Sequence, residues 1–204
     1  MGKCMINKNI FKDARFVGSY VSALKLGKAC AEVAFVGRSN VGKSSLINAL
    51  CGSRVLAKVS KTPGKTRTIN VYAVCFGKWL VDLPGYGFAN VSKEEHYGWK
   101  EMIESYLSGR TSLKAIFITI DADVGATTLD LQMLDWLKSV NISFRVIVNK
   151  IDRITQSRLA QQRQSLALDL ELTPEHITWV SAKKGIGIKD IHSIISGFLA
   201  APKL

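Results

Sequence analysis

The feature that most constrains the fold is a glycine-containing run in the first quarter of the chain, Gly37-Arg38-Ser39-Asn40-Val41-Gly42-Lys43-Ser44, which fits the pattern GxxxxGK[ST]. The run comes directly after an apolar strand candidate, Val33 to Val36, and directly before an amphipathic helix candidate, Lys43 to Cys51. In that context the glycines let the backbone wrap until its N–H groups point at phosphate oxygens, and the following helix adds its positive N-terminal end. The sequence therefore predicts a phosphate-binding loop at the end of a strand.

Two side chains of this loop have expected roles. Lys43 should bridge the β- and γ-phosphates of a nucleotide, and Ser44 should place its hydroxyl on Mg²⁺, which neutralises charge between those phosphates. The loop by itself does not separate GTPases from ATPases or small-molecule kinases, so the choice among them depends on motifs farther along the chain.

Short apolar runs alternate with longer amphipathic ones over the rest of the chain, as expected of βαβ units on a mostly parallel sheet. The strand candidates are Val33–Val36, Ile69–Phe76, Trp79–Asp82, Ala115–Ile120, Phe144–Asn149 and Ile177–Val180. The helix candidates are Lys43–Cys51, Lys93–Ser108, Thr128–Ser139, Thr155–Leu170 and Lys189–Leu199. We therefore expect an α/β fold of the P-loop NTPase type, a Ras-like G domain with about six strands in a mostly parallel sheet flanked by helices.

The length of 204 residues suits one domain. Residues 31–204 are the expected G domain, and residues 1–30 are an N-terminal extension that could add a strand and a helix ahead of the first core strand. The segment from Gly52 to Thr68 has little periodicity and contains Pro63 and Gly64, which predicts a long exposed loop with a functional role.

A second motif, Asp82-Leu83-Pro84-Gly85, follows the apolar run of a strand candidate. Its carboxylate would stand at the carboxyl end of a strand, where α/β sheets place their ligands, and Asp82 suits an indirect hold on Mg²⁺. Gly85 would offer a backbone N–H to the γ-phosphate, and its conformational freedom would let the loop respond when that phosphate leaves. An ordinary turn after a strand explains the same four residues when they are taken in isolation.

A third motif, Asn149-Lys150-Ile151-Asp152, selects the base. The Asp152 carboxylate can accept N1–H and the exocyclic N2–H of guanine, whereas adenine has no donor at those positions and would leave a buried carboxylate unpaired. Asn149 should tie this segment to the base and to the phosphate loop, while the stem of Lys150 lies across the ring. Behind the two earlier motifs in chain order, this one predicts binding of GTP and GDP.

Two further segments complete the expected site. Val180-Ser181-Ala182-Lys183 resembles the SAK loop that supports the guanine O6 through a backbone N–H in translation-type GTPases. A GTPase also needs one Thr in its long loop to bind Mg²⁺ and to sense the γ-phosphate, and the candidates are Thr62, Thr66 and Thr68.

Four runs together, GRSNVGKSSLINAL, KTPGKTRTIN, DLPGYGFA and WKEMIESYL, resemble the EngB (YsxC/YihA) family of bacterial GTPases. The resemblance runs from about Glu32 to the C-terminus. The family is similar to the Era-like GTPases, within the TrmE-Era-EngA-EngB-Septin-like P-loop GTPases. The resemblance implies GTP and GDP binding with Mg²⁺, assistance in assembly of the large ribosomal subunit, and an association with cell division and septum formation.

Carried over residue by residue, the resemblance implies nucleotide contacts in five segments. They are Gly37 to Ser44, Gly64-Lys65-Thr66-Arg67-Thr68, Asp82 to Gly85, Asn149 to Asp152, and Val180-Ser181-Ala182. It also selects Thr66, with Ser44, as the Mg²⁺ ligands, and it gives Lys43, Thr66 and Gly85 as the residues expected to act in catalysis. Two departures are NKID in place of the usual TKxD, and Asp121-Ala122-Asp123 in place of the usual residues after that strand.

The residue after the second motif bears on the rate of hydrolysis. In Ras-like switches that residue is a Gln that orients the attacking water, and this chain has Tyr86. We therefore expect slow intrinsic hydrolysis, with the water positioned by a partner surface, by backbone groups or by a monovalent cation. Asn40 would hold K⁺ beside the phosphates in one interpretation, and in the other it only shapes the loop.

The charge and hydropathy of the chain bear on its partners. It has 28 Lys and Arg against 16 Asp and Glu, a net charge of +12 that favours attraction to polyanions, nucleic acid first. Together with the resemblance, this predicts ribosomal RNA or a precursor of the large subunit as partner, with phosphate contacts from Lys58, Lys61, Lys65 and Arg67. No apolar run approaches the ~20 residues that span a bilayer, so we expect no stable membrane insertion. The start of the chain lacks the unbroken apolar core of a secretory signal, which favours a cytoplasmic location, and we also expect a monomer.

Three other functions remain open from the sequence. A P-loop kinase or ATPase would use the same phosphate loop but has no use for NKID. A GTPase switch could act outside the ribosome. An RNA-binding module without turnover would explain the charge of +12, but not the spacing of the three nucleotide motifs.

Overall fold

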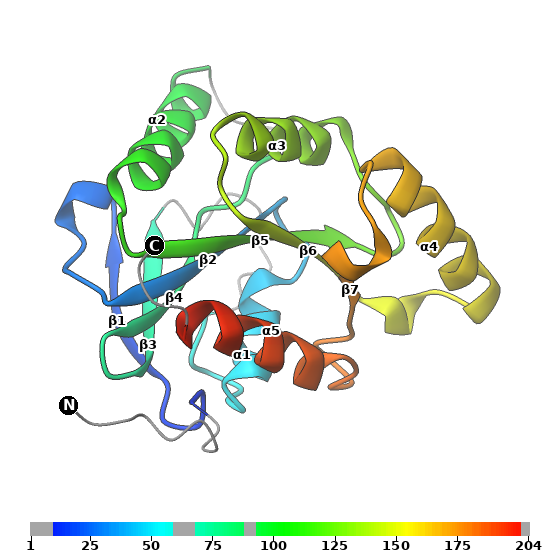
Figure 1. Ribbon diagram of the computed structural model, residues 1–204, viewed down its shortest axis with the longest axis horizontal. Coiled ribbons are helices and arrows are strands. Elements are labelled where there is room, and N and C mark those ends of the chain that lie inside the picture. The colour runs from blue at the N-terminus through cyan, green and yellow to red at the C-terminus, as the bar shows by residue number, and fades with distance from the viewer. Residues whose placement is uncertain (1–9, 59–67, 88–92, 201–204) are drawn as a thin grey trace.

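The structure, a computed structural model, describes residues 10–58, 68–87 and 93–200, with the backbone alone for residues 93–97. Within that part of the chain, seven strands form one sheet in the order β1-β3-β4-β2-β5-β6-β7 (Figure 1). They are β1 Arg15–Tyr20, β2 Ala31–Gly37, β3 Ile69–Cys75, β4 Lys78–Asp82, β5 Leu113–Asp121, β6 Phe144–Asn149 and β7 Ile177–Trp179. The pairs β1–β3 and β3–β4 are antiparallel and the other four are parallel, so the predicted mostly parallel α/β sheet is confirmed.

All five predicted helices are present in the described residues. They are α1 Lys43–Leu50, α2 Lys93–Gly109, α3 Thr128–Ser139, α4 Gln156–Asp169 and α5 Ile188–Ala200. Three short 3₁₀ helices, which the sequence did not predict, are η1 Ala23–Lys25, η2 Ile151–Arg153 and η3 Pro174–His176. Each predicted helix therefore lies within two residues of its expected bounds.

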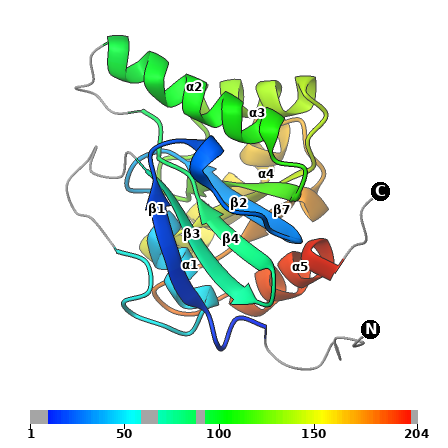
Figure 2. The same cartoon turned by 90° about the vertical axis from the view of Figure 1, so that its left-hand side faces the viewer.

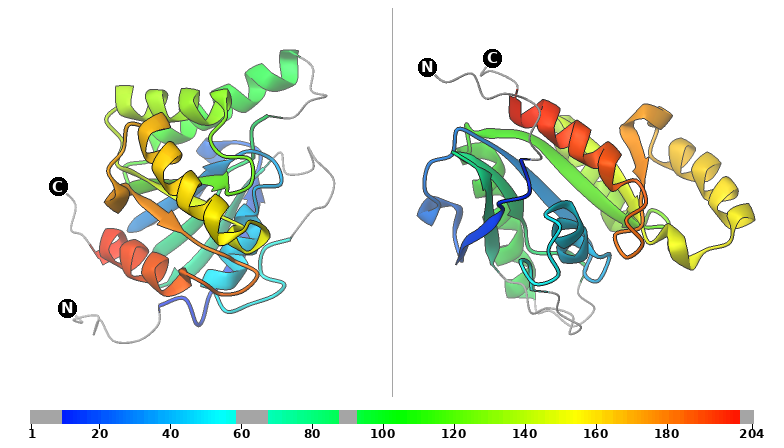
Figure 3. Two further views of the ribbon diagram at one scale, coloured as in Figure 1. Left: turned by 90° about the vertical axis from the view of Figure 1, so that its right-hand side faces the viewer. Right: turned by 90° about the horizontal axis from the view of Figure 1, so that it is seen from below.

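The helices cover both faces of the sheet. In Figure 1, α2 and α3 lie above the sheet and α1 and α5 lie below it, and Figure 3 shows α1 and α5 from below. Successive residues of a strand point to opposite faces, so Ile116 and Ile118 pack in the core under α2 and α3, whereas Ala115 and Phe117 pack against α1 and α5. Burial on both faces explains why these strands are nearly continuous apolar runs.

The strand β1 raises the count from about six strands to seven. It pairs with β3, from Arg15 opposite Ala73 to Tyr20 opposite Ile69, at the edge of the sheet (Figure 2). The expected extra strand of the N-terminal extension is therefore present, and between residues 10 and 30, where the structure describes the extension, the expected extra helix is only the 3₁₀ turn η1.

The sheet topology brings the sequence motifs together. Register pairs Phe35 of β2 with Asp82 of β4, and Asp121 of β5 with Asn149 of β6. Because β2, β4, β5 and β6 are parallel, their carboxyl ends meet at one edge of the sheet, where α/β folds bind ligands. No helix in the described ranges is long and apolar enough to cross a lipid bilayer.

Candidate functional site

The loop between β2 and α1 is held in a conformation that requires glycine. Gly42 has φ +96°, a value that residues with a Cβ rarely adopt, and a Cβ there would lie 2.5 Å from Nδ2 of Asn149. A Cβ at Gly37 would collide with the backbone of Thr119 on the neighbouring strand β5. The helix α1 starts at Lys43, so its unpaired N–H groups face the loop.

Lys43 lies folded over this loop. Its side chain is buried, and its Nζ donates a hydrogen bond to the carbonyl oxygen of Gly37 at 3.1 Å. Burial lowers the pKa of the Lys43 ammonium, while the nearby Asp82 carboxylate raises it. An ammonium group held here can donate to anionic oxygens that enter the loop.

Asp82 and Ser44 face each other across the site. Ser44 Oγ donates to Asp82 Oδ2 at 3.2 Å, and Asp82 is only 2% exposed. Burial raises the pKa of Asp82, opposed by the charge of Lys43 and by the hydrogen bond from Ser44. In the described part of the chain, Asp82 Oδ1 is buried with no hydrogen-bond partner.

An orphaned carboxylate oxygen beside a hydroxyl fits a hydrated Mg²⁺ ion. No group of three or more His, Cys, Asp or Glu side chains among the described residues could form a metal site by itself. Mg²⁺ suits this arrangement, because it is usually held by few protein ligands together with water and nucleotide phosphates.

The segment after Asp82 lies directly against the phosphate loop. Tyr86 N donates to the Gly37 carbonyl at 3.4 Å, and Ser39 N donates to the Tyr86 carbonyl at 3.0 Å. A Cβ on Gly85 would lie 3.1 Å from Nζ of Lys43 and 3.2 Å from N of Ser39. A side chain at position 85 would therefore crowd the loop and its lysine.

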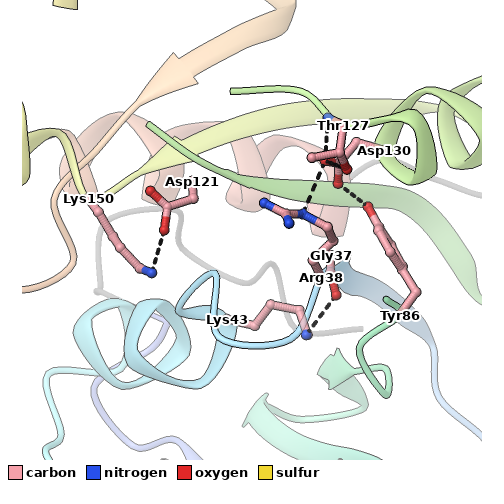
Figure 4. A network of polar contacts seen from close by, with 8 residues as sticks. All are labelled: Gly37, Arg38, Lys43, Tyr86, Asp121, Thr127, Asp130 and Lys150. Atoms are coloured by element: carbon pink, nitrogen blue, oxygen red, sulfur yellow. Dashed lines mark hydrogen bonds and ion pairs between the residues drawn. The ribbon is translucent and has the colours of Figure 1, made fainter. Parts of the chain in front are cut away.

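The Tyr86 side chain points away from the loop and into the protein (Figure 4). It is 5% exposed, and its hydroxyl donates to Asp130 Oδ1 at 2.6 Å. Its ring meets Trp99 edge-on at 5.8 Å, and the indole of Trp99 donates to the Pro84 carbonyl at 2.9 Å. Burial, then the negative charge of Asp130, raises the pKa of Tyr86 well above its ordinary value, so the hydroxyl keeps its proton.

Asp130 is the centre of this network. It stands in the first turn of α3, is 1% exposed, and accepts the backbone N–H of Thr127 at 2.9 Å and its hydroxyl at 2.6 Å on Oδ2. Arg38 of the phosphate loop places its Nε 3.5 Å from the same oxygen. One carboxylate therefore links α3, the phosphate loop and the segment that follows Asp82 (Figure 4).

Asn149 joins the phosphate loop to the segment after β7. Its side chain is 2% exposed, and Nδ2 donates to the Val41 carbonyl at 3.1 Å. The backbone N of Ala182 donates to Asn149 Oδ1 at 3.1 Å. The predicted link to the phosphate loop is present, and the same side chain also fixes the Ser181–Ala182 turn.

Lys150 stretches from the end of β6 toward the phosphate loop (Figure 4). Its Nζ donates to the Asn40 carbonyl at 2.6 Å and to Asp121 Oδ2 at 2.5 Å, and its φ of 70° is left-handed. Asp121 is one of the residues that depart from the family pattern, and here it forms the ion pair that fixes Lys150.

Asp152 stands at the opening of the site. Ser181 Oγ donates to Asp152 Oδ1 at 2.5 Å, and this bond, more than any other contact, lowers the pKa of Asp152. Ser181 is itself held, because its Oγ accepts the backbone N–H of Lys184 at 3.0 Å. The carboxylate is charged and fixed in orientation, as a group that accepts two hydrogen bonds from a base must be.

The structure brings four predicted segments to one edge of the sheet: Gly37 to Ser44, Asp82 to Gly85, Asn149 to Asp152 and Val180 to Ala182. The predicted contacts at Gly64 to Arg67 lie outside the described residues, as do Lys61 and Thr62. Thr68 is described, and its hydroxyl donates to Asn70 Oδ1 at 3.4 Å.

The sequence interpretation missed the roles of Asp121 and Asp130. The spacing Thr127-x-x-Asp130 at the start of a helix candidate is the signal of a helix cap, which explains the hydrogen bonds that Asp130 accepts from Thr127. Its bond with Tyr86 joins residues 44 positions apart and is visible only in the fold.

Comparisons with known proteins agree with this geometry. A family model described as 50S ribosome-binding GTPase matches residues 32–150. The probable GTP-binding protein EngB of Thermotoga petrophila is 42% identical over 191 residues, which cover 93% of this chain and 95% of that protein. The corresponding protein of Aquifex aeolicus is 45% identical over 165 residues, covering 80% of this chain and 88% of that protein.

Solved structures show the same likeness. The crystal structure of a probable GTP-binding protein engB has a TM-score of 0.69 at 27% identity, covering 83% of this chain and 98% of that one. Era in complex with MgGDPNP and nucleotides 1506–1542 of 16S ribosomal RNA has a TM-score of 0.67 at 26% identity, covering 87% of this chain and 59% of that one. With the phosphate loop, Gly85 and the NKID motif at one edge of a G-domain sheet, the chain belongs to the EngB family of GTP-binding proteins and is a P-loop GTPase.

Proposed function

We propose that this GTPase binds GTP and GDP at the edge of the sheet described above and acts as a slow switch in assembly of the large ribosomal subunit. The observation that carries the nucleotide site is the pair of hydrogen bonds made by Asn149. One reaches Val41 in the phosphate loop and the other comes from Ala182 beside Asp152, so phosphate-binding and base-binding groups form one rigid unit.

The base-binding end is suited to guanine. Asp152 carries a lowered pKa and is oriented by Ser181, so it can accept N1–H and N2–H of the base. Lys150 is held by Asp121 and Asn40, which aligns its aliphatic stem for the ring face. Adenine offers no donors at these positions, and it would leave the Asp152 carboxylate without partners.

At the phosphate-binding end, Lys43 and the backbone N–H groups of Gly37 to Ser44 would bind the β- and γ-phosphates. Mg²⁺, when bound, neutralises charge between these phosphates. Ser44 and Thr66 would be its protein ligands, and Asp82, with its unpaired Oδ1, would hold one of the bound waters. Gly85 would donate its N–H to the γ-phosphate.

Hydrolysis should be slow because the position after Gly85 supplies no carboxamide. The Tyr86 hydroxyl is engaged with Asp130 on the side away from the phosphate loop, so it does not orient an attacking water in this conformation. A K⁺ ion held by Asn40 remains one route to faster turnover. Equal turnover in KCl and NaCl would exclude that route, and turnover of many GTP per second by the isolated protein would contradict slow hydrolysis.

The nucleotide site is tested by replacing Asp152 with Asn. An amide at this position can donate to the O2 of xanthine, so Asp152→Asn should lose GDP affinity and gain XDP affinity. Asp123→Asn is the matched control, since Asp123 is an exposed aspartate at the same edge of the sheet and should leave both affinities unchanged. Retained preference for GDP in Asp152→Asn would remove the role given to Asp152.

The ribosomal role is supported by the description of the matching family model, by the RNA complex of Era and by the net charge of +12. Family resemblance adds an association with cell division, while a cytoplasmic location and a monomeric state are expectations from the sequence. Co-sedimentation with large-subunit precursors should be stronger with a GTP analogue than with GDP, and it should weaken as salt rises. If co-sedimentation changed with neither nucleotide nor salt, the ribosomal role would be contradicted, and the alternative of a GTPase that acts outside the ribosome would be favoured.

The rival function is a P-loop kinase or ATPase. It would require ATP to displace a fluorescent GDP derivative at concentrations similar to those of GTP. The Asn149 to Asp152 geometry favours the guanine nucleotide, so we expect displacement by GTP and GDP only.

A further inference from the structure

Gly85 and Tyr86 lie against the part of the phosphate loop where a γ-phosphate would bind. In the function proposed above, this phosphate lies between the Lys43 ammonium and the backbone N–H of Gly85. Each of these hydrogen bonds needs about 2.7–3.2 Å between donor and oxygen. A Cβ built on Gly85 would lie only 3.1 Å from Nζ of Lys43 and 3.2 Å from N of Ser39, so Gly85 lies close over the end of the loop where that phosphate would bind.

The segment that contains Gly85 and Tyr86 is also hydrogen-bonded to the phosphate loop. Lys43 donates to the Gly37 carbonyl, and Ser39 N donates to the Tyr86 carbonyl. Tyr86 N donates back to Gly37, so Arg38 and Tyr86 form a short parallel bridge that continues the pairing of β2 with β4. The Tyr86 carbonyl thus occupies the Ser39 N–H, one of the loop N–H groups that would bind phosphate. We therefore expect a γ-phosphate to displace Gly85 and Tyr86 from the loop, whereas GDP has no third phosphate and leaves the bridge intact.

The Tyr86 side chain holds the segment of Gly85 and Tyr86 in place from the side away from the phosphate loop. Its hydroxyl donates to the buried carboxylate of Asp130, which Thr127 and Arg38 hold in place from α3 and from the loop. A hydrogen bond to a buried charged group is worth more than a neutral one, and it forms only while Tyr86 stays beside α3. The side chains are seen together in Figure 4.

We propose that Tyr86 and Asp130 set the preference between GDP and GTP, because their hydrogen bond holds Gly85 against the phosphate loop in the conformation that excludes a γ-phosphate. They are positioning residues, which act through Gly85 and do not touch the nucleotide. This inference rests on the proposed nucleotide site, and it adds the device by which the chain distinguishes diphosphate from triphosphate.

The test compares the affinities of the full-length protein for GDP and for the non-hydrolysable analogue GMPPNP, both with Mg²⁺. Tyr86→Phe removes only the hydroxyl and keeps the ring against Trp99. It should raise the affinity for GMPPNP about tenfold and leave the affinity for GDP unchanged, since only the conformation that excludes GTP loses a bond. Asp130→Asn should shift the ratio in the same direction, because a single amide oxygen cannot serve Tyr86 and both donors of Thr127.

The chain offers a matched control at the opposite end of β2. Tyr106 is buried and donates to Glu32 at 3.1 Å, and Arg110 pairs with that carboxylate, so a tyrosine, a carboxylate and an arginine meet again, here without touching the phosphate loop. Tyr106→Phe should lower thermal stability as Tyr86→Phe does, but leave the ratio of GMPPNP to GDP affinity at the native value.

The possible results separate this inference from the function on which it rests. If the native protein bound neither nucleotide, the proposed nucleotide site would fail. If the native protein bound both and Tyr86→Phe kept the native ratio, the nucleotide site would stand and the role of Tyr86 and Asp130 would be refuted. A shift in Tyr106→Phe as large as that in Tyr86→Phe would also refute it, because the effect would then follow general stability.

Discussion

Replacing Asn149 by alanine should damage both the stability and the nucleotide affinity of the protein. Asn149 is 2% exposed and makes two hydrogen bonds, to the Val41 carbonyl and from the Ala182 N–H. Each backbone group that is left buried without its partner costs about 1–3 kcal/mol. For the two groups together we expect Asn149→Ala to lower the free energy of unfolding by about 2–6 kcal/mol.

The effect on binding follows from what the two bonds join. Without Asn149 the phosphate loop and the Ser181–Ala182 turn are no longer fixed to each other, so a nucleotide must order them as it binds. GDP affinity should fall about tenfold or more, equivalent to the loss of at least one hydrogen bond. Calorimetric titration with GDP and urea unfolding measure the two effects in the same preparation.

Asn48 supplies the matched control. It is 6% exposed, Nδ2 donates to the Ala57 carbonyl at 2.8 Å, and Oδ1 accepts the Ala57 N–H at 2.7 Å. Asn48→Ala therefore removes two buried bonds of the same kind, but within the loop after α1. It should lose similar stability and keep the native GDP affinity. If Asn149→Ala bound GDP as tightly as the native protein despite its lower stability, Asn149 would not join the two halves of the site.

Three further results are expected. Arg110→Met should cost about 3–5 kcal/mol of unfolding free energy in urea, since it leaves the Glu32 carboxylate buried without its positive partner and with only the Tyr106 hydroxyl, and adding Glu32→Gln should restore part of it. Hydrogen bonding from Ser181 lowers the pKa of Asp152, so the stability that this carboxylate contributes is present above the ordinary aspartate pKa and is lost as pH falls through the lowered pKa. Carboxyl ¹³C NMR should show that Ser181→Ala raises the pKa of Asp152 toward its ordinary value. Burial raises the pKa of the Cys51 thiol to about 12, so mass spectrometry should find Cys51 unalkylated by iodoacetamide at pH 8 until the protein unfolds; rapid labelling of folded protein would contradict this burial.

The core of the fold could be predicted because its strands are buried on both faces. Phe144–Asn149 and Thr128–Ser139 were predicted with the bounds that the structure gives them. β1 was harder to define because it lies at an edge with most of its side chains exposed, so its apolar residues do not follow the alternation of a half-buried strand. The 3₁₀ turn η2 was missed because it is only three residues long and follows a motif interpreted for its chemistry.

The contacts of the site could likewise be predicted only in part. Motif spacing predicted that Asn149 reaches the phosphate loop, because the chemistry of guanine binding requires it. The ion pair of Asp121 with Lys150 could not be predicted, since it depends on the register of β5 beside β6. Tyr86 was recognised as unable to orient water, but its bond with Asp130 depends on how α3 packs over the sheet.

The N-terminal strand also helps to fix the position of β3 in the sheet. β3 is hydrogen-bonded on both sides, to β1 from Ile69 onward and to β4 through the hairpin that ends at Asp82. A slip of β3 by one residue would break both ladders and turn buried Val71 out of the core. The two ladders therefore fix the register of β3 from Ile69 onward, and through Asn70 opposite Asp82 they fix the end of β4 beside the phosphate loop.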